Sequence, residues 1–210
     1  MALSPELREA RCRTLVDAAH ALIRDTGDTG FSMLELARRA GVSPATPYNL
    51  LGSKAEVLRR VVRDEYESFS ARLALLPPET PLNRLLHAVD LVVVHYAAEP
   101  NFYRGLYLSI LDVRANDLRA MMTAEGQLLW CDMIRQAVDA GELARILPDD
   151  MLTALLLRTM GATVEAWLAE DWDQTQFARE MFIASRTIML GLLPEAHRAE
   201  LVQQLSAAVA

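Results

Sequence analysis

The sequence has little cysteine and lysine, with two cysteines and a single lysine, and only nine glycines and nine prolines in 210 residues. The two cysteines, Cys12 and Cys131, are too few for a disulfide framework or a cysteine-rich zinc site, so we expect reduced thiols. The low glycine and proline content excludes a collagenous or linker-rich chain. A hydrophobic content of 52% is ample for a packed core and excludes a disordered tail protein.

Long hydrophobic runs are also lacking. The most apolar stretch, residues 91–98, contains His95 and is far shorter than the ~20 residues that a membrane span needs. The first 13 residues carry charges every few positions and show no apolar core, which excludes a signal peptide. We therefore expect a cytoplasmic protein with no membrane partner.

Charge is unevenly distributed along the chain. The formal net charge of −7 argues against nucleic acid as a partner, because nucleic-acid binders are usually basic. However, the first 60 residues hold nine basic and seven acidic side chains, whereas the remaining 150 hold 12 basic and 21 acidic ones. A mildly positive N-terminal part precedes an acidic remainder of the chain. Only the N-terminal part has a charge compatible with binding a polyanion such as nucleic acid.

Apolar residues recur at helical spacing from end to end, and we find no alternating run that predicts a strand. Ser4-Pro5 is typical of a helix start, and Gly27 of a helix end. The clearest break is the proline-rich segment 77–81. Beyond it we expect helices at 82–98, 100–113, 117–140, 149–170, 174–192 and 195–208.

Two short helices joined by a glycine turn indicate a helix-turn-helix. Ser32 and Glu35 form a capping-box pattern before a helix at 34–40, and Ser43-Pro44 is typical of the next helix start. Gly41 can adopt the positive φ that the turn needs. The second helix has small or polar residues in its first turns, as a helix that reaches DNA base edges requires. A second capping-box pattern, Ser53 to Glu56, predicts a longer helix to about residue 76.

The stretch from Arg13 to about Leu58 resembles the tetracycline-repressor (TetR) family of bacterial transcription regulators. The matching residues are Ala18-Ala19, Gly27, Phe31-Ser32, Leu36-Ala37, Ala40-Gly41-Val42-Ser43, Thr46, Tyr48, Ser53-Lys54 and Leu58. The resemblance implies an all-α fold with an N-terminal helix-turn-helix DNA-binding domain and a C-terminal helical ligand-binding and dimerisation domain. The expected boundaries are 1–53 for the DNA-binding domain, 54–76 for a connecting helix and 77–210 for the second domain.

The resemblance also implies roles for single residues. Ser32 would cap its helix and bind a phosphate, Thr46 and Tyr48 would contact DNA, and Lys54 would bind a phosphate at a helix start. Sequence choice would lie with residues near the recognition helix. The expected DNA-binding residues are Ser32, Ser43, Pro44, Ala45, Thr46, Tyr48, Asn49 and Lys54.

The sequence departs from the family pattern at Pro47 and at Leu50-Leu51, where the family usually has leucine and His-Phe. If Pro44 is the first helical residue, Pro47 is the fourth and removes one backbone hydrogen bond. A core position for Tyr48 and a merely solvated helix face for Arg38 and Arg39 remain the alternatives.

The C-terminal part offers candidates for a small-molecule pocket, with apolar walls and a few polar groups. They are His87, His95, Tyr103, Tyr107, Met122, Trp130 and Arg158. For any one of them alone, a core or surface role is the stronger interpretation. His87 and His95 lack a third ligand at metal spacing, so we expect neither a metal site nor a cofactor.

Helix 149–170 is apolar almost all round, so it must be buried on more than one side. Pairing it and helix 174–192 with their symmetry mates gives the four-helix homodimer of the family.

No phosphate loop, zinc-protease motif or nucleophile elbow is present, so we do not expect an enzyme. The sequence thus favours a ligand-responsive dimeric regulator, typically a repressor, that binds a pseudo-palindromic operator. Two alternatives remain: a helical enzyme or carrier with a vestigial helix-turn-helix, and a regulator that has no ligand.

Overall fold

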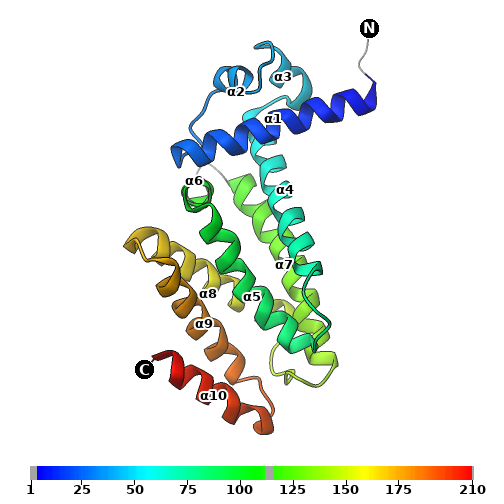
Figure 1. Ribbon diagram of the computed structural model, residues 1–210. Helices are drawn as coiled ribbons and strands as arrows, with labels where there is room; N and C mark the ends of the chain where they lie inside the picture. The colour runs from blue at the N-terminus through cyan, green and yellow to red at the C-terminus, as the bar shows by residue number, and fades with distance from the viewer. Residues whose placement is uncertain (1–3, 112–115, 210) are drawn as a thin grey trace. The chain divides into compact units, whose positions relative to one another are not determined.

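The fold is all-α, and the computed structural model describes residues 4–111 and 116–209, without the side chains of residues 110–111, 116–123, 125 and 196. Within this part of the chain no residue lies in a strand. The helices, drawn in Figure 1, are α1 (Pro5–Thr26), α2 (Met33–Arg39), α3 (Thr46–Leu51), α4 (Lys54–Ala74), α5 (Pro81–Ala98), α6 (Pro100–Leu111), α7 (Asn116–Asp139), α8 (Asp149–Glu170), α9 (Gln174–Leu190) and α10 (Glu195–Val209). None of the described helices is long and apolar enough to cross a bilayer.

The helices form two compact units. The first comprises Met1–Ser70 with Ala98–Met122, and the second comprises Ala71–Ala97 with Thr123–Ala210. α6 therefore packs with the N-terminal helices, although it follows them by many residues. The units describe packing, and the functional boundaries at residues 53 and 76 remain a prediction.

The first unit is built on α1. Ser4 caps this helix by accepting a hydrogen bond from the Leu7 backbone N–H, and Gly27 ends it with φ of 65°. Both ends were predicted from the sequence. Leu15, Ala19 and Ile23 are completely buried, which gives α1 an apolar face against its neighbours.

α6 packs very closely on the C-terminal end of α1. A Cβ atom added to Gly105 would lie 2.8 Å from Ile23 Cγ2 and 3.0 Å from the backbone of Gly27 and Asp28. Such distances leave no room for a side chain, so glycine is required at this crossing.

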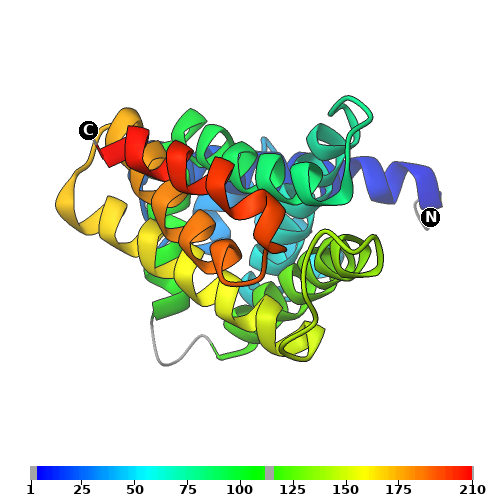
Figure 2. The same cartoon turned by 90° about the horizontal axis from the view of Figure 1, so that it is seen from below.

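In the second unit α8 and α9 lie side by side, as Figures 1 and 2 both show. The rings of Trp167 on α8 and Phe177 on α9 stack with their centroids 4.5 Å apart and an interplanar angle of 8°. Arg186 on α9 is almost fully buried and pairs with Asp90 on α5 at 2.7 Å. An apolar stack and an ion pair between the buried Arg186 and the partly exposed Asp90 thus fix α9 against two neighbours.

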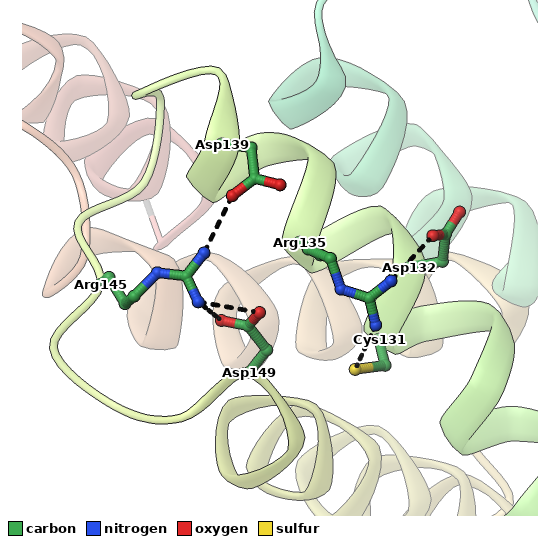
Figure 3. A network of polar contacts seen from close by, with 6 residues as sticks. All are labelled: Cys131, Asp132, Arg135, Asp139, Arg145 and Asp149. Atoms are coloured by element: carbon green, nitrogen blue, oxygen red, sulfur yellow. Dashed lines mark hydrogen bonds and ion pairs between the residues drawn. The ribbon is translucent and has the colours of Figure 1, made fainter.

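The loop between α7 and α8 is fixed by arginine, as Figure 3 shows. Arg145 donates to Asp139 at the end of α7 at 2.9 Å and to both oxygens of Asp149 at the start of α8 at 3.0 and 3.1 Å. One guanidinium therefore joins the two helix ends. In the same loop, Glu142 accepts a hydrogen bond of 2.6 Å from the Leu82 backbone at the start of α5.

Candidate nucleic-acid interface

The predicted helix-turn-helix is formed by α2, a glycine turn and α3. Gly41 has φ of 66°, and the next backbone N–H, that of Val42, donates to the Ala37 carbonyl at 3.0 Å. Ala37 is buried and small where the two helices approach each other. α1 packs against both short helices and supports them (Figure 1). The turn chemistry predicted from the sequence is confirmed.

α2 begins with the predicted capping box. The Ser32 backbone N–H donates to Glu35 Oε2 at 2.7 Å, and the Glu35 backbone N–H donates to Ser32 Oγ at 3.1 Å. The hydrogen bond from the Ser32 backbone, followed by that from its hydroxyl, lowers the pKa of the Glu35 carboxyl. The side chain of Ser32 is therefore engaged in capping and lies on the surface of the unit.

α3 begins later than predicted, and this corrects the position of both prolines. The helix starts at Thr46 after an N-cap at Ala45, so Pro44 lies in the turn before it. Pro47 is the second helical residue, where a missing backbone N–H leaves no carbonyl unbonded. The predicted loss of a backbone hydrogen bond at Pro47 is thus wrong, because the Ser43 carbonyl accepts from the Thr46 N–H at 2.9 Å. Instead, the hydroxyls of Ser43 and Thr46 lie 2.8 Å apart and close the turn.

Pro47 and Leu51 are buried, and between them α3 turns polar groups outward. Tyr48 is 57% exposed, which excludes the core position left open by the sequence. Asn49 is also exposed, as are Ser43, Pro44 and Ala45 in the preceding turn, while Thr46 is half-buried. The residues predicted to face DNA therefore lie together on the surface at one short helix and its turn.

α4 begins at Lys54, directly after Gly52 and Ser53. The Ser53 hydroxyl caps the helix by accepting from the Glu56 backbone N–H at 3.2 Å. The predicted reciprocal bond is replaced, because the Ser53 N–H donates to the Leu51 carbonyl at 2.9 Å and Glu56 pairs with Arg59 at 2.9 Å. Only half of the second capping box is formed.

Lys54 is held in place by an aromatic ring. Its ammonium lies 4.9 Å from the centroid of the Phe31 ring, and the side chain is half-buried. Burial lowers the pKa of Lys54, and the carboxylates of Asp28 and Glu35 oppose that effect. The ammonium thus occupies the first turn of α4, where the helix dipole also favours an anion.

The arginines of this region divide into paired and unpaired ones. Arg39 donates to Asp25 at 2.6 Å and so joins α2 to α1, and Arg60 lies 3.6 Å from Glu9. Arg38 and Arg11, in contrast, form no salt bridge with a described residue and are exposed. The paired Arg39 is therefore a structural side chain, and Arg38 is the better candidate for a phosphate contact.

The residues predicted for a small-molecule pocket are distributed over both units. Tyr103 and Tyr107 belong to the first unit, whereas His87, His95, Trp130 and Arg158 belong to the second. The side chain of Met122 lies outside the described residues. No single site that joins them is visible within one unit, and the pocket stays a prediction.

Within the second unit these residues have different surroundings. His87 is largely exposed and lies 2.7 Å from Glu79, while His95 is buried and accepts a hydrogen bond from Arg72 at 3.0 Å. Arg158 lines an open groove of about 410 Å³ along α8 and α9. The described residues contain no group of metal-ligating side chains.

Three features of the first unit had no counterpart in the sequence analysis. The ion pair between Asp25 and Arg39 joins residues 14 apart, and a polar cluster around His20 joins three helices. Sequence spacing carries no signal for either, because the partners come from separate elements. The ring of Phe31 under Lys54 is equally a product of the tertiary fold.

Comparison with known proteins agrees with this geometry. Residues 15–61 match the model of the N-terminal domain of the family described as bacterial regulatory proteins, tetR family. The HTH-type transcriptional regulator BetI of Rhizobium meliloti is 42% identical over 57 residues, which cover 27% of this chain and 28% of BetI.

Solved structures extend the similarity of fold to nearly the whole chain. RolR in complex with resorcinol superposes with a TM-score of 0.72 at 16% identity, covering 95% of this chain and 94% of RolR. SmeT, the repressor of a Stenotrophomonas maltophilia multidrug efflux pump, superposes with a TM-score of 0.71 at 16% identity, covering 88% of this chain and 91% of SmeT. The N-terminal part of the chain thus matches the tetR family of bacterial regulatory proteins, and nearly the whole chain shares an all-α fold with these solved structures.

Proposed function

We propose that the chain is a ligand-responsive transcriptional repressor that binds operator DNA as a homodimer through α3 and the first turn of α4. The observation that carries the proposal is the joint exposure of Tyr48 and Asn49 on a short helix whose start is closed by Ser43 and Thr46. A helix of this kind can enter a major groove that is ~12 Å wide.

Contacts divide into those that position the protein and those that read sequence. Lys54 at the start of α4 and Arg38 on α2 would bind phosphates. Asn49 and the turn residues Pro44 and Ala45 would approach base edges, where an amide side chain pairs best with adenine. Tyr48 would contact the backbone with its phenol.

The dimer is supported by the surface of α8 and α9. Met151 and Leu155 on α8 lie one helical turn apart and are 58% and 42% exposed, so they add apolar area to this surface. The nearby groove is lined by small residues, among them Ala162, Ala166 and Ala184. Such a surface suits the close approach of helices from a second copy. Two-fold symmetry then requires half-sites about one DNA turn (~34–36 Å) apart, or a multiple of it.

An effector would act by binding one conformation better than the other, since only differential affinity shifts an equilibrium. RolR, which shares this fold, was solved with resorcinol bound. We propose a small molecule as the effector of this chain as well. The signal would pass along α4, whose residues up to Ser70 belong to the first unit and whose last turn belongs to the second.

The test is selection of DNA by the purified full chain from a library of duplexes with a randomised central segment. We expect an inverted repeat to be enriched, and its binding to weaken steeply with salt, as counterion release requires. A library that stays random after repeated rounds would refute the proposal. Turnover of a bound compound without DNA binding would favour the enzyme or carrier instead.

A further inference from the structure

A cluster of four polar side chains connects three helices of the first unit. His20 lies on α1, Glu65 on α4, Glu99 immediately before α6, and Tyr103 on α6. His20 Nε2 is 3.3 Å from Glu65 Oε1 and 3.5 Å from Glu99 Oε2, and the Tyr103 hydroxyl donates to the other oxygen of Glu65. We call these four residues the His20 cluster.

The imidazole of His20 is fixed in this position by an aromatic ring. It stacks on Phe102, which is completely buried, with a centroid distance of 3.9 Å and an interplanar angle of 28°. The side chain of His20 itself retains 26% exposure. Protons from solvent can therefore reach the ring while its orientation is held.

Two carboxylates face the ring from two different elements, and one cation opposes them. The hydrogen bond with Glu65 is the largest cause of a raised pKa at His20, and the charge of Glu99 adds to it. Burial and the charge of Arg24 on α1 lower the pKa of His20, but the two carboxylates raise it by more. Glu99 Oε2 is buried and accepts no hydrogen bond, so the imidazolium is the group that compensates its charge.

We propose that protonation of His20 controls how tightly α4 and the start of α6 hold α1. With the proton bound, one cation lies between two carboxylates and joins all three helices. Without it, Glu65 and Glu99 face each other across a neutral ring that can at most donate one hydrogen bond, and the charge attraction is lost. The pair of carboxylates then favours separation of the elements that carry them.

The direction of the effect on stability follows from the shift. Because the pKa of His20 is higher in the folded chain than its ordinary value of 6.5, the folded state binds the proton more tightly than the unfolded chain does. The stabilisation of the folded state is complete when the pH is below the ordinary pKa of 6.5. It is lost as the pH rises through the raised pKa of His20 in the folded chain. The contact is therefore closed in mildly acidic solution and opens towards alkaline pH.

The consequence for DNA binding rests on the proposed function. α1 supports α2 and α3. If α1 is held less tightly in the free protein, it must become ordered when the protein binds DNA. The entropy lost in that ordering lowers the affinity for DNA. We expect operator affinity to fall as His20 loses its proton. A rise in pH would then weaken binding without any effector.

The first experiment uses no DNA. Histidine resonances of the full chain are followed by NMR from about pH 5.5 to about pH 9, the range in which imidazoles titrate. We expect His20 to titrate above the ordinary midpoint of 6.5. In Glu99→Gln the His20 midpoint should fall, because one carboxylate is gone and the Phe102 stack remains. A His20 midpoint at or below 6.5, or one that Glu99→Gln leaves in place, would overturn the proposal.

Thermal unfolding is the second measurement. It distinguishes a role of His20 that depends on its protonation from a purely structural role. The Tm of the wild-type chain should fall by about 2–4 °C more than that of His20→Gln between about pH 6 and about pH 9. His197→Gln is the matched control and should follow the wild type. Equal pH profiles for the wild type and His20→Gln would contradict the proposal even if the variant is less stable throughout.

The third measurement is fluorescence anisotropy with the duplex selected from the random library. The affinity of the wild type should fall about fivefold or more over the same pH range, and that of His20→Gln should change less. If the NMR midpoint is raised but both proteins show the same pH profile on DNA, the regulatory consequence is refuted. If no duplex is selected at any pH, the proposed function fails, and the two DNA-free experiments still decide whether the His20 cluster titrates as described.

Discussion

Gly105 shows how a single residue determines a helix crossing. Its hydrogen is all that separates α6 from Ile23 and from the backbone at the end of α1. We expect Gly105→Ala to destabilise the chain by about 1–3 kcal/mol, because the backbone of Gly27 and Asp28 cannot move aside as a flexible side chain would. Urea unfolding followed by circular dichroism measures the difference.

Gly191→Ala is the control for that substitution. Gly191 has an ordinary helical φ of −67°, and a Cβ atom there would meet only the Ile188 carbonyl at 3.8 Å. The control should change stability little or raise it slightly. If both variants unfold at the same urea concentration, the close crossing of α1 and α6 is not as described.

Lys54 is the second residue whose substitution should give a distinct, measurable effect. If its ammonium binds a phosphate, Lys54→Gln should weaken binding to all duplexes alike and reduce the slope of log K against log salt by about one. Titrations at several salt concentrations give that slope. Arg135→Gln also removes one exposed positive charge, from α7 rather than α4, and should leave the slope unchanged. A similar loss of slope in both variants would indicate a general charge effect in place of a contact.

At the scale of the element, α3 should determine sequence preference. Asn49 is exposed and lies beyond the closed turn of Ser43 and Thr46. Asn49→Ala should relax the preference at one base pair of each half-site, costing about 1–3 kcal/mol on the best duplex and much less on random DNA. Competition between matched and mismatched duplexes measures this discrimination. An equal loss on both would make Asn49 a backbone contact.

Single helices show both where prediction from sequence succeeded and where it failed. The ends of α1 and the capping box of α2 were predictable, because Ser4, Gly27 and Ser32 act on backbone groups within a few residues. The start of α3 was misplaced because Pro44 and Pro47 both fit a first helical turn, and only the packing of Pro47 into the core decides between them.

The partners of His20 and Arg39 were not predictable, because those contacts join side chains from separate helices. Local spacing describes one element at a time. A single sequence therefore predicts which residues a short helix and its turn expose, and it does not reveal the ones that hold the supporting helices together.

At the scale of the whole molecule, the α8 and α9 surface should govern assembly. A large side chain in the groove would keep the helices of a second copy apart, so Ala162→Arg should give a monomer at micromolar concentration in sedimentation equilibrium. The same substitution on the exposed face of α10, Ala199→Arg, should leave the dimer intact.

Loss of the dimer should also be visible on DNA. Binding of the second half-site is intramolecular only while the two copies are joined, so Ala162→Arg should weaken operator binding by about 100-fold or more. A monomeric variant that binds as tightly as the wild type would show that each copy acts alone.

The charge distribution is consistent with contact through the N-terminal part alone. Its nine basic side chains exceed its seven acidic ones by little, and several of them are paired within the protein. The acidic remainder would be repelled by a duplex. In the proposed function, affinity would therefore come from a few contacts around α3 and the start of α4, and from the pairing of two copies.

Hydroxyl-radical footprinting of the wild-type chain on the selected duplex tests this most directly. We expect two protected patches on one face of the DNA, centred about one turn (~34–36 Å) apart or at a multiple of it, and both fading in Lys54→Gln. A single patch, protection without regular spacing, or a footprint that Lys54→Gln and Asn49→Ala leave unchanged would contradict binding by a dimer through α3 and the start of α4.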